Sequence, residues 1–500
     1  MSALSVPANR GQSEGALHFQ HDQADFSKAL AGDLNGAKLH AAGIEVITAP
    51  PNPDNYDHPI TDLLQITPAE NQVPGFVDSN NTIVQTVFMS YARGREHLFN
   101  QLTDIFEEIS PEGNNIKLAI YMENYHPDGV NHDQRLSFIE RRFENTENIV
   151  FLPSLGHRPE RISDPIGTFP EDAMTFVNDE NGLPVVYGFG DQRRREALEG
   201  ILEFGENSMI HPQRGGRMAE HTAEMLNGLE FEEKRYLTYG GDLHIGGFES
   251  AAGDGEIIQK QFFGHETIRL TRARVFSDES NLPSHLQGLT EEQQLLYSTA
   301  LIMGEIEEIS GTASQAFPLG AGDTTIGDTL ASLPQSVLSE FSPSVLDRLE
   351  ALSEFPVATR NAGDSSYNYH VDTFMVPLTN NIVLINEDDA DSSFAEMLRS
   401  DPEINLQLLP ARIDFEGEYS ERRISYMNML TINNGEEMHL ILQTEGVNTE
   451  ELTEFDEHVR DTLEELGFRV HFVDYSAVMS PGQDWGLNCL TQAVGFSIDD

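Results

Sequence analysis

The sequence has almost no cysteine or tryptophan: its 500 residues include one of each, Cys489 and Trp485. A single cysteine excludes an intrachain disulfide framework and every zinc site that needs several cysteines. It is kept either for packing, as a small buried hydrophobe, or for its chemistry, as a nucleophile. Gly486 before the cysteine and the polar Thr-Gln pair after it favour a thiol near the end of a strand.

Positive charge is also scarce. The net charge is −53, and there are only five lysines: Lys28, Lys38, Lys117, Lys234 and Lys260. Such a surface repels nucleic acid and anionic membranes, so neither is expected as a partner. The charge could attract a cationic substrate, or it could be an adaptation to high salt, where screening weakens self-repulsion. The acidic residues are spread over the whole chain, and the second interpretation explains that spread without pointing to any reaction.

Long apolar runs are missing. None approaches the roughly 20 residues needed to span a bilayer. Residues 1–15 lack a basic patch followed by an apolar run, so no signal peptide is expected and we predict a cytoplasmic protein. The hydrophobic content of 39% still supports a globular core. The length fits a few ordinary domains or one large repetitive domain.

Composition divides the chain into an extension and a main body. Residues 1–75 are rich in Asn, Pro, Asp, Gln and Gly and are predicted to form an irregular N-terminal extension. Residues 76–500 are predicted to form one catalytic α/β domain, because strand and helix patterns alternate along them. A helical insertion at about 286–355 interrupts this alternation. It could act as a lid or as a contact in a homo-oligomer.

The alternating patterns predict particular elements. Strands are expected at 82–90, 116–122, 149–152 and 468–473, and helices at 95–109, 132–143, 290–309, 342–352 and 451–466. Hairpins are expected at 171–187, 369–386 and 425–443. Hairpins that recur with a helix and a further strand indicate repeated ββαβ-type units, although no sequence repeat is evident.

Five short motifs follow one another along the chain. They are Asp172 in the run FPEDAMTFV at 169–177, Gly240-Gly241-Asp242, His370-Val371-Asp372, Ser425-Tyr426-Met427-Asn428, and Asn488-Cys489-Leu490-Thr491-Gln492. In this order they resemble the agmatine deiminase and bacterial peptidyl-arginine deiminase family, in the guanidino-group-modifying pentein superfamily. The likeness covers about residues 80–500 without the insertion. It implies a five-bladed α/β propeller around an acidic funnel, with a thiolate that attacks the guanidinium carbon.

The chemistry of these residue types agrees with that substrate class. A guanidinium is planar and permanently charged, and carboxylates hold it through bidentate, charge-assisted hydrogen bonds. Burying this cation unpaired would be prohibitive, so acids must line its pocket. Asp172 and Asp372 are the candidates to grip it. Cys489 would be the nucleophile, its thiolate favoured by the bound cation and by a neighbouring histidine.

His370 would protonate the leaving amine and then activate the water that releases the product. On a strand, His370 and Asp372 would point to the same face. Phe169 and Trp485 are also assigned to the substrate site, and no metal or cofactor is required. Three of the titratable candidates have a structural alternative: His370 as an ordinary strand histidine, and Asp172 and Asp242 as turn residues.

The chain also departs from the family pattern. The relatives carry an acid that orients the catalytic histidine where Tyr239 stands here, and Asp242 could take that role. Glu171 replaces an arginine, and Asp484 and Trp485 interrupt the glycine-rich run before the cysteine. Three functions therefore stay open. These are a deiminase acting on agmatine, arginine or peptidyl-arginine through a thiouronium-type intermediate, an amidinotransferase, and a non-catalytic pentein-fold binding protein.

Overall fold

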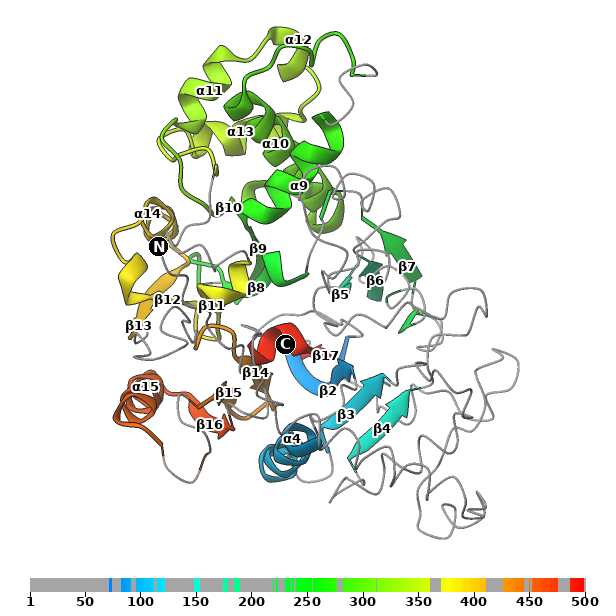
Figure 1. Cartoon of the computed structure of the whole chain (residues 1–500), viewed down its shortest axis with the longest axis vertical. Coiled ribbons are helices and arrows are strands. Elements are labelled where there is room, and N and C mark those ends of the chain that lie inside the picture. Colours follow the sequence, from blue (N-terminus) through cyan, green and yellow to red (C-terminus); the bar gives the residue numbers. More distant parts are fainter. Residues whose placement is uncertain are drawn as a thin grey trace, which may run out of the picture.

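The computed structural model is a mixed α/β fold (Figure 1). It describes residues 72–73, 82–90, 96–111, 115–121, 148–152, 174–178, 184–188, 219, 222–223, 230–234, 236–237, 240–253, 255–276, 282–311, 313–359, 370–410, 426–444, 449, 452–474 and 486–498. The predicted helix at 132–143 and most of the predicted extension at 1–75 lie outside these residues. In the described part of the chain, no helix is long and apolar enough to cross a membrane.

Four sheets share one pattern of three strands. Their strands are β5 (Met174–Asn178), β6 (Pro184–Gly188) and β7 (Glu230–Glu233); β8 (Leu243–Glu249), β9 (Ile257–Phe263) and β10 (Ala316–Pro318); β11 (Met375–Pro377), β12 (Ile382–Asn386) and β13 (Asn405–Leu409); β14 (Leu430–Asn433), β15 (Met438–Gln443) and β16 (Arg469–Val473). In each sheet the first two strands are antiparallel, and the third lies parallel to the second. The predicted recurrence of hairpins with a further strand is confirmed.

The fifth sheet joins the two ends of the described chain. Its strands are β1 (Gln72–Val73), β17 (Thr491–Ile498), β2 (Thr82–Ser90), β3 (Lys117–Tyr121) and β4 (Ile149–Leu152), in that order. β17 is antiparallel to β2 and β3 is parallel to β2, so β17-β2-β3 repeats the three-strand pattern. In Figure 1 the first strands of all five units lie toward the middle of the molecule, and β7, β10, β13 and β16 lie farther out.

In four of the units, described helices connect the second strand to the third. They are α4 (Glu96–Ile109), α9 (His265–Phe276) with α10 (Glu291–Ser310), α14 (Ser393–Ser400) and α15 (Glu454–Glu465). Capping residues mark the ends of two of these helices. Thr290 and Thr453 begin α10 and α15 with capping boxes, and α10 ends at Gly311, whose φ of 77° suits glycine. The inward face of α4 buries apolar side chains at helical spacing: Leu98, Phe99, Leu102, Phe106 and Ile109.

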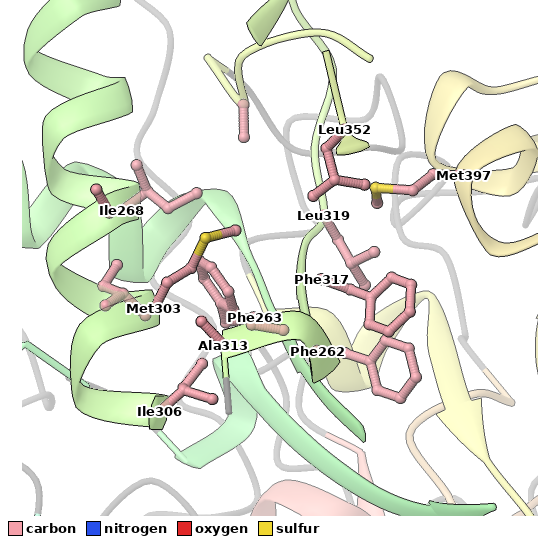
Figure 2. Close-up of a cluster of buried hydrophobic side chains, with 14 of the residues drawn as sticks. Phe262, Phe263, Ile268, Met303, Ile306, Ala313, Phe317, Leu319, Leu352 and Met397 are labelled. Atoms are coloured by element: carbon pink, nitrogen blue, oxygen red, sulfur yellow. The ribbon is translucent and has the colours of Figure 1, made fainter. Parts of the chain in front are cut away.

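The predicted helical segment 286–355 contains α10, α11 (Ile326–Ser332), α12 (Gln335–Leu338) and α13 (Pro343–Ala351). It also contains β10, which pairs with β9, so this segment adds a strand to a sheet as well as helices. Figure 2 shows side chains of β9, α10 and β10 packed in one core, with Met397 of α14 close by. The helices therefore belong to the same core as two of the sheets.

Candidate active site

The candidate residues lie just before the first strands of their units. η2 (Gly240–Asp242) precedes β8, and η4 (Val371–Thr373) precedes β11. Residues 426–429 precede β14, and α17 (Leu487–Leu490) precedes β17. η2 lies against η4, and α17 lies against β14 and β15. Four segments far apart in the sequence thus occupy equivalent places in the repeat and meet in space.

The thiol of Cys489 faces a carboxylate. Cys489 is 8% exposed and packs on one side against an apolar cluster that includes Leu487 and Leu490. Its Sγ donates to Oδ2 of the fully buried Asp372 at 2.9 Å. The location predicted for the cysteine is confirmed, since α17 runs directly into β17. The residue is buried and also makes a polar contact with an acid.

Asn428 is a third member of this cluster. Its Nδ2 lies 2.6 Å from Oδ2 of Asp372 and 3.0 Å from Sγ of Cys489. Sequence reasoning included Asn428 in a motif but gave it no role. Its position in the sequence could have pointed to such a role, because Asn428, like the other candidates, comes just before the first strand of its unit.

The turn that carries the cysteine is held by the same asparagine. The Asn428 carbonyl accepts the backbone N–H groups of Leu487 at 3.0 Å and of Asn488 at 3.3 Å. Its Oδ1 accepts the N–H of Cys489 at 3.1 Å. A Cβ at Gly486 would lie 2.2 Å from Oδ1 of Asn428, so only glycine permits this approach.

His370 and Asp372 do not lie on a strand, so the predicted shared strand face is wrong. Val371–Thr373 forms a 3-10 turn, in which the Thr373 hydroxyl donates to the His370 carbonyl at 2.6 Å. A threonine that bonds back to the main chain in this way stabilises a turn at the expense of an extended ladder. Asp372 still reaches the thiol, while His370 interacts electrostatically with a different acid, Asp242.

Asp242 is the last residue of η2 and is fully buried. Its side chain contacts the first turn of α9. Its Oδ2 accepts the N–H of Thr267 at 2.5 Å, and among the described residues its Oδ1 has no hydrogen-bond partner. A Cβ at Gly264 would lie 2.0 Å from that Oδ1, so glycine is required there. Burial raises the pKa of Asp242 to about 7, against the lowering effects of His370 and of the Thr267 amide.

Two groups of candidates are therefore assembled. Cys489, Asp372 and Asn428 are in direct contact, and Asp242 interacts with His370. Several positions discussed from the sequence lie outside the described residues, among them Phe169, Asp172, Tyr239 and Trp485. Within the part of the chain that the structure describes, no group of three or more His, Cys, Asp or Glu side chains is arranged to hold a metal ion.

No protein-family model matches this chain, and no curated protein matches it. Solved structures do. A substrate-bound agmatine deiminase from C. jejuni matches at 13% identity and a TM-score of 0.46, over 85% of this chain and 97% of that chain. An agmatine deiminase of Enterococcus faecalis matches at 12% identity and a TM-score of 0.46, over 86% and 99% of the two chains.

An amidinotransferase from Microseira wollei matches at 11% identity and a TM-score of 0.35, over 84% of this chain and 98% of that chain. The resemblance noted in the sequence is confirmed to this extent: the structural neighbours are guanidino-group-modifying enzymes.

Proposed function

We propose that this protein is a cysteine-dependent hydrolase of a guanidine compound, a deiminase. The observation that carries the proposal is the 2.9 Å contact between the only thiol of the chain and the fully buried carboxylate of Asp372. A nucleophile beside an acid suits a planar cation, since the carboxylate grips a nitrogen while the sulfur faces the carbon.

Charge explains why the substrate should be cationic. A thiolate and a carboxylate this close repel one another, so in the empty site the thiol keeps its proton and donates a hydrogen bond to Asp372. A guanidinium bound to Asp372 supplies the opposite charge and favours the thiolate, so the thiol releases its proton to solvent when the substrate binds. Ionisation of the nucleophile is then coupled to the arrival of the substrate.

The repeated units support a five-bladed propeller as the architecture around this site. Four segments before first strands supply Asp242, Asp372, Asn428 and Cys489. The fifth first strand is β5, and Asp172 precedes it in the sequence by two residues. The repeat thus supports Asp172 as the second carboxylate that holds the guanidinium. We further propose that Phe169 and Trp485 border the substrate.

In the first half-reaction, the thiolate of Cys489 attacks the guanidinium carbon and forms a C–S bond. His370 gives its proton to the leaving nitrogen, which departs as ammonia or as an amine, and a thiouronium-type intermediate remains on the sulfur. In the second half-reaction, His370 takes a proton from water and the oxygen attacks the same carbon. The C–S bond breaks, the ureido product and the thiolate are released, and a second proton leaves to solvent.

Asp242 has the surroundings of a residue that orients His370. It is buried and fixed by Thr267, and it interacts electrostatically with His370. Asp242 could therefore replace the acid that orients the catalytic histidine in the relatives, which have it where this chain has Tyr239. Asp242 then keeps the imidazole in one orientation for both proton transfers.

The test is turnover of guanidine compounds. The purified protein is incubated with agmatine, arginine or a peptidyl-arginine, and ureido product and ammonia are assayed. Cys489→Ser should lower turnover by about a thousand-fold or more, because a serine hydroxyl is not ionised at neutral pH. Asn433→Ala, in the same neighbourhood but at the other end of β14, is the matched control and should stay active.

Other outcomes separate the alternatives. Unchanged turnover in Cys489→Ala would overturn the proposal. Transfer of the amidino group to an added amine, with no ureido product, would indicate an amidinotransferase. Binding of a guanidine compound without turnover would indicate a binding protein.

A further inference from the structure

We infer that Asn428 is a positioning residue that allows a thiolate to exist beside Asp372. The inference rests on the proposed function, because a thiolate matters only if Cys489 is a nucleophile. The observation behind it is that one amide nitrogen reaches both groups, at 3.0 Å from Sγ and 2.6 Å from the carboxylate oxygen.

The orientation of the amide is fixed by its other end. Oδ1 accepts the backbone N–H of Cys489 at 3.1 Å, and only the oxygen of the amide can do so. The nitrogen must then face the sulfur and the carboxylate. Its two N–H bonds match two acceptors, and Asn428 is only 4% exposed, so water does not easily take either place.

The amide has a different task in each state of the sulfur. In the resting state the thiol donates to Asp372, and the amide N–H has only a neutral sulfur to face. Once the sulfur is ionised, the same N–H becomes a charge-assisted donor to an anion. It then lies between two negative groups and can donate one N–H to each of them. The Asn428 N–H stabilises the sulfur a second time, when the C–S bond of the intermediate breaks and the thiolate forms again.

The backbone ties the amide to the reaction geometry. The Asn428 carbonyl and Oδ1 hold three successive N–H groups of α17, those of Leu487, Asn488 and Cys489. A displacement of Asn428 therefore moves the sulfur with it. The close approach of Gly486 leaves no room for the turn to shift toward the asparagine.

The experiment uses the absence of other thiols. Cys489 is the only cysteine, so alkylation of the full-length protein by iodoacetamide reports on this sulfur alone. The alkylation rate is measured against pH, without substrate, in wild type, Asn428→Ala and Asn428→Asp. We expect the midpoint of the rate profile to move to higher pH by about one unit in Asn428→Ala, because a donor to the thiolate is lost.

Asn428→Asp is nearly isosteric and keeps an acceptor for the Cys489 amide, so it should fold even if the alanine variant does not. Its carboxyl group lies beside Asp372, shares one proton with it and adds a negative charge as the pH rises, so its midpoint should also move to higher pH. The matched control is Asn433→Ala, whose asparagine accepts the Gly435 N–H at an exposed turn, and it should overlay wild type. Profiles of both Asn428 variants that overlay wild type would overturn the inference.

Turnover separates this inference from the proposed reaction. In an active wild type, Asn428→Ala should lower kcat by about ten-fold and leave KM nearly unchanged, because Asp372 still grips the substrate. If wild type turns over no guanidine but the midpoint moves, the proposed function fails and the role of Asn428 at the sulfur stands. If wild type is active and both Asn428 variants match it in kcat and in midpoint, the inference fails alone.

Discussion

At the scale of single residues, Asp242 couples the site to pH. Burial raises its pKa to about 7, whereas an unfolded aspartate has a pKa of about 4. Between these values the folded protein holds a proton that the unfolded chain has released. The contribution of Asp242 to stability is therefore fully present below about pH 4 and is lost as the pH rises through 7.

Asp242→Asn should remove this dependence. The asparagine oxygen can still accept the Thr267 N–H, and no charge has to be buried at high pH. We expect the free energy of unfolding of the variant, relative to wild type, to increase by about 1–4 kcal/mol between pH 5 and pH 8. Denaturant unfolding at the two pH values measures it. A difference between variant and wild type that is equal at both pH values would contradict the burial argument.

How well the sequence predicted the site depends on residue type. Cys489, His370, Asp372 and Asp242 could be selected because thiols, imidazoles and carboxylates have chemistry that a motif makes visible. Asn428 could not be assigned a role, since an amide does not titrate and its contact spans 61 residues of sequence. Only the fold brings it to the sulfur.

At the scale of elements, hairpins were predicted well and short turns were not. The hairpin predicted at 369–386 is confirmed by the antiparallel strands β11 and β12, and its turn holds Asn380 and Asn381, both with φ of 61°, a conformation that asparagine tolerates. Val371–Thr373 was predicted as strand but forms a 3-10 turn. Its alternation of apolar and polar residues fits a strand and a short turn equally well. The bond from the Thr373 hydroxyl to the His370 carbonyl decides between them.

Glu305 of α10 fixes the segment that leads into η2. Its carboxylate is 8% exposed and accepts the N–H groups of Tyr236 at 2.7 Å and Leu237 at 2.9 Å. Glu305→Ala removes this acceptor from the N–H of the buried Leu237 and from that of the partly buried Tyr236. We expect a loss of about 1–3 kcal/mol in the free energy of unfolding, measured by denaturant titration.

Two variants of the same helix test this explanation. Glu305→Gln keeps an acceptor oxygen and should lose less than the alanine variant. Glu308→Ala, at an exposed position of α10, should change stability by less than about 0.5 kcal/mol. Equal losses in Glu305→Ala and Glu308→Ala would mean that the contacts of Glu305 with the two backbone N–H groups do not explain the effect.

At the scale of the whole molecule, the repeat was predictable, but the pairing of strands from the two ends of the described chain was not. Recurring hairpins with a further strand gave the three-strand units. The pairing of β17 with β2 joins Thr491 to Met89 across most of the chain, and no local pattern indicates such a partner. The domain boundaries at 75 and 76 and the cytoplasmic location stay predictions.

The net charge of −53 makes a prediction for the intact protein. Like charges on one compact body repel, and the Debye length falls from about 10 Å at 0.1 M salt to about 3 Å at 1 M. If the acidity is an adaptation to salt, the midpoint of thermal unfolding should rise steadily with KCl over this range. Scanning calorimetry in a KCl series measures it.

The control is the same series near pH 4.4, the isoelectric point, where the net charge is small. There the repulsion is largely gone, so added KCl should raise the midpoint much less than at pH 7. If the acidity instead serves to attract a cationic substrate, KCl should raise KM for a guanidine while the unfolding midpoint changes little. An unfolding midpoint that depends on salt equally at both pH values would contradict the charge argument, because the salt would then act on apolar burial.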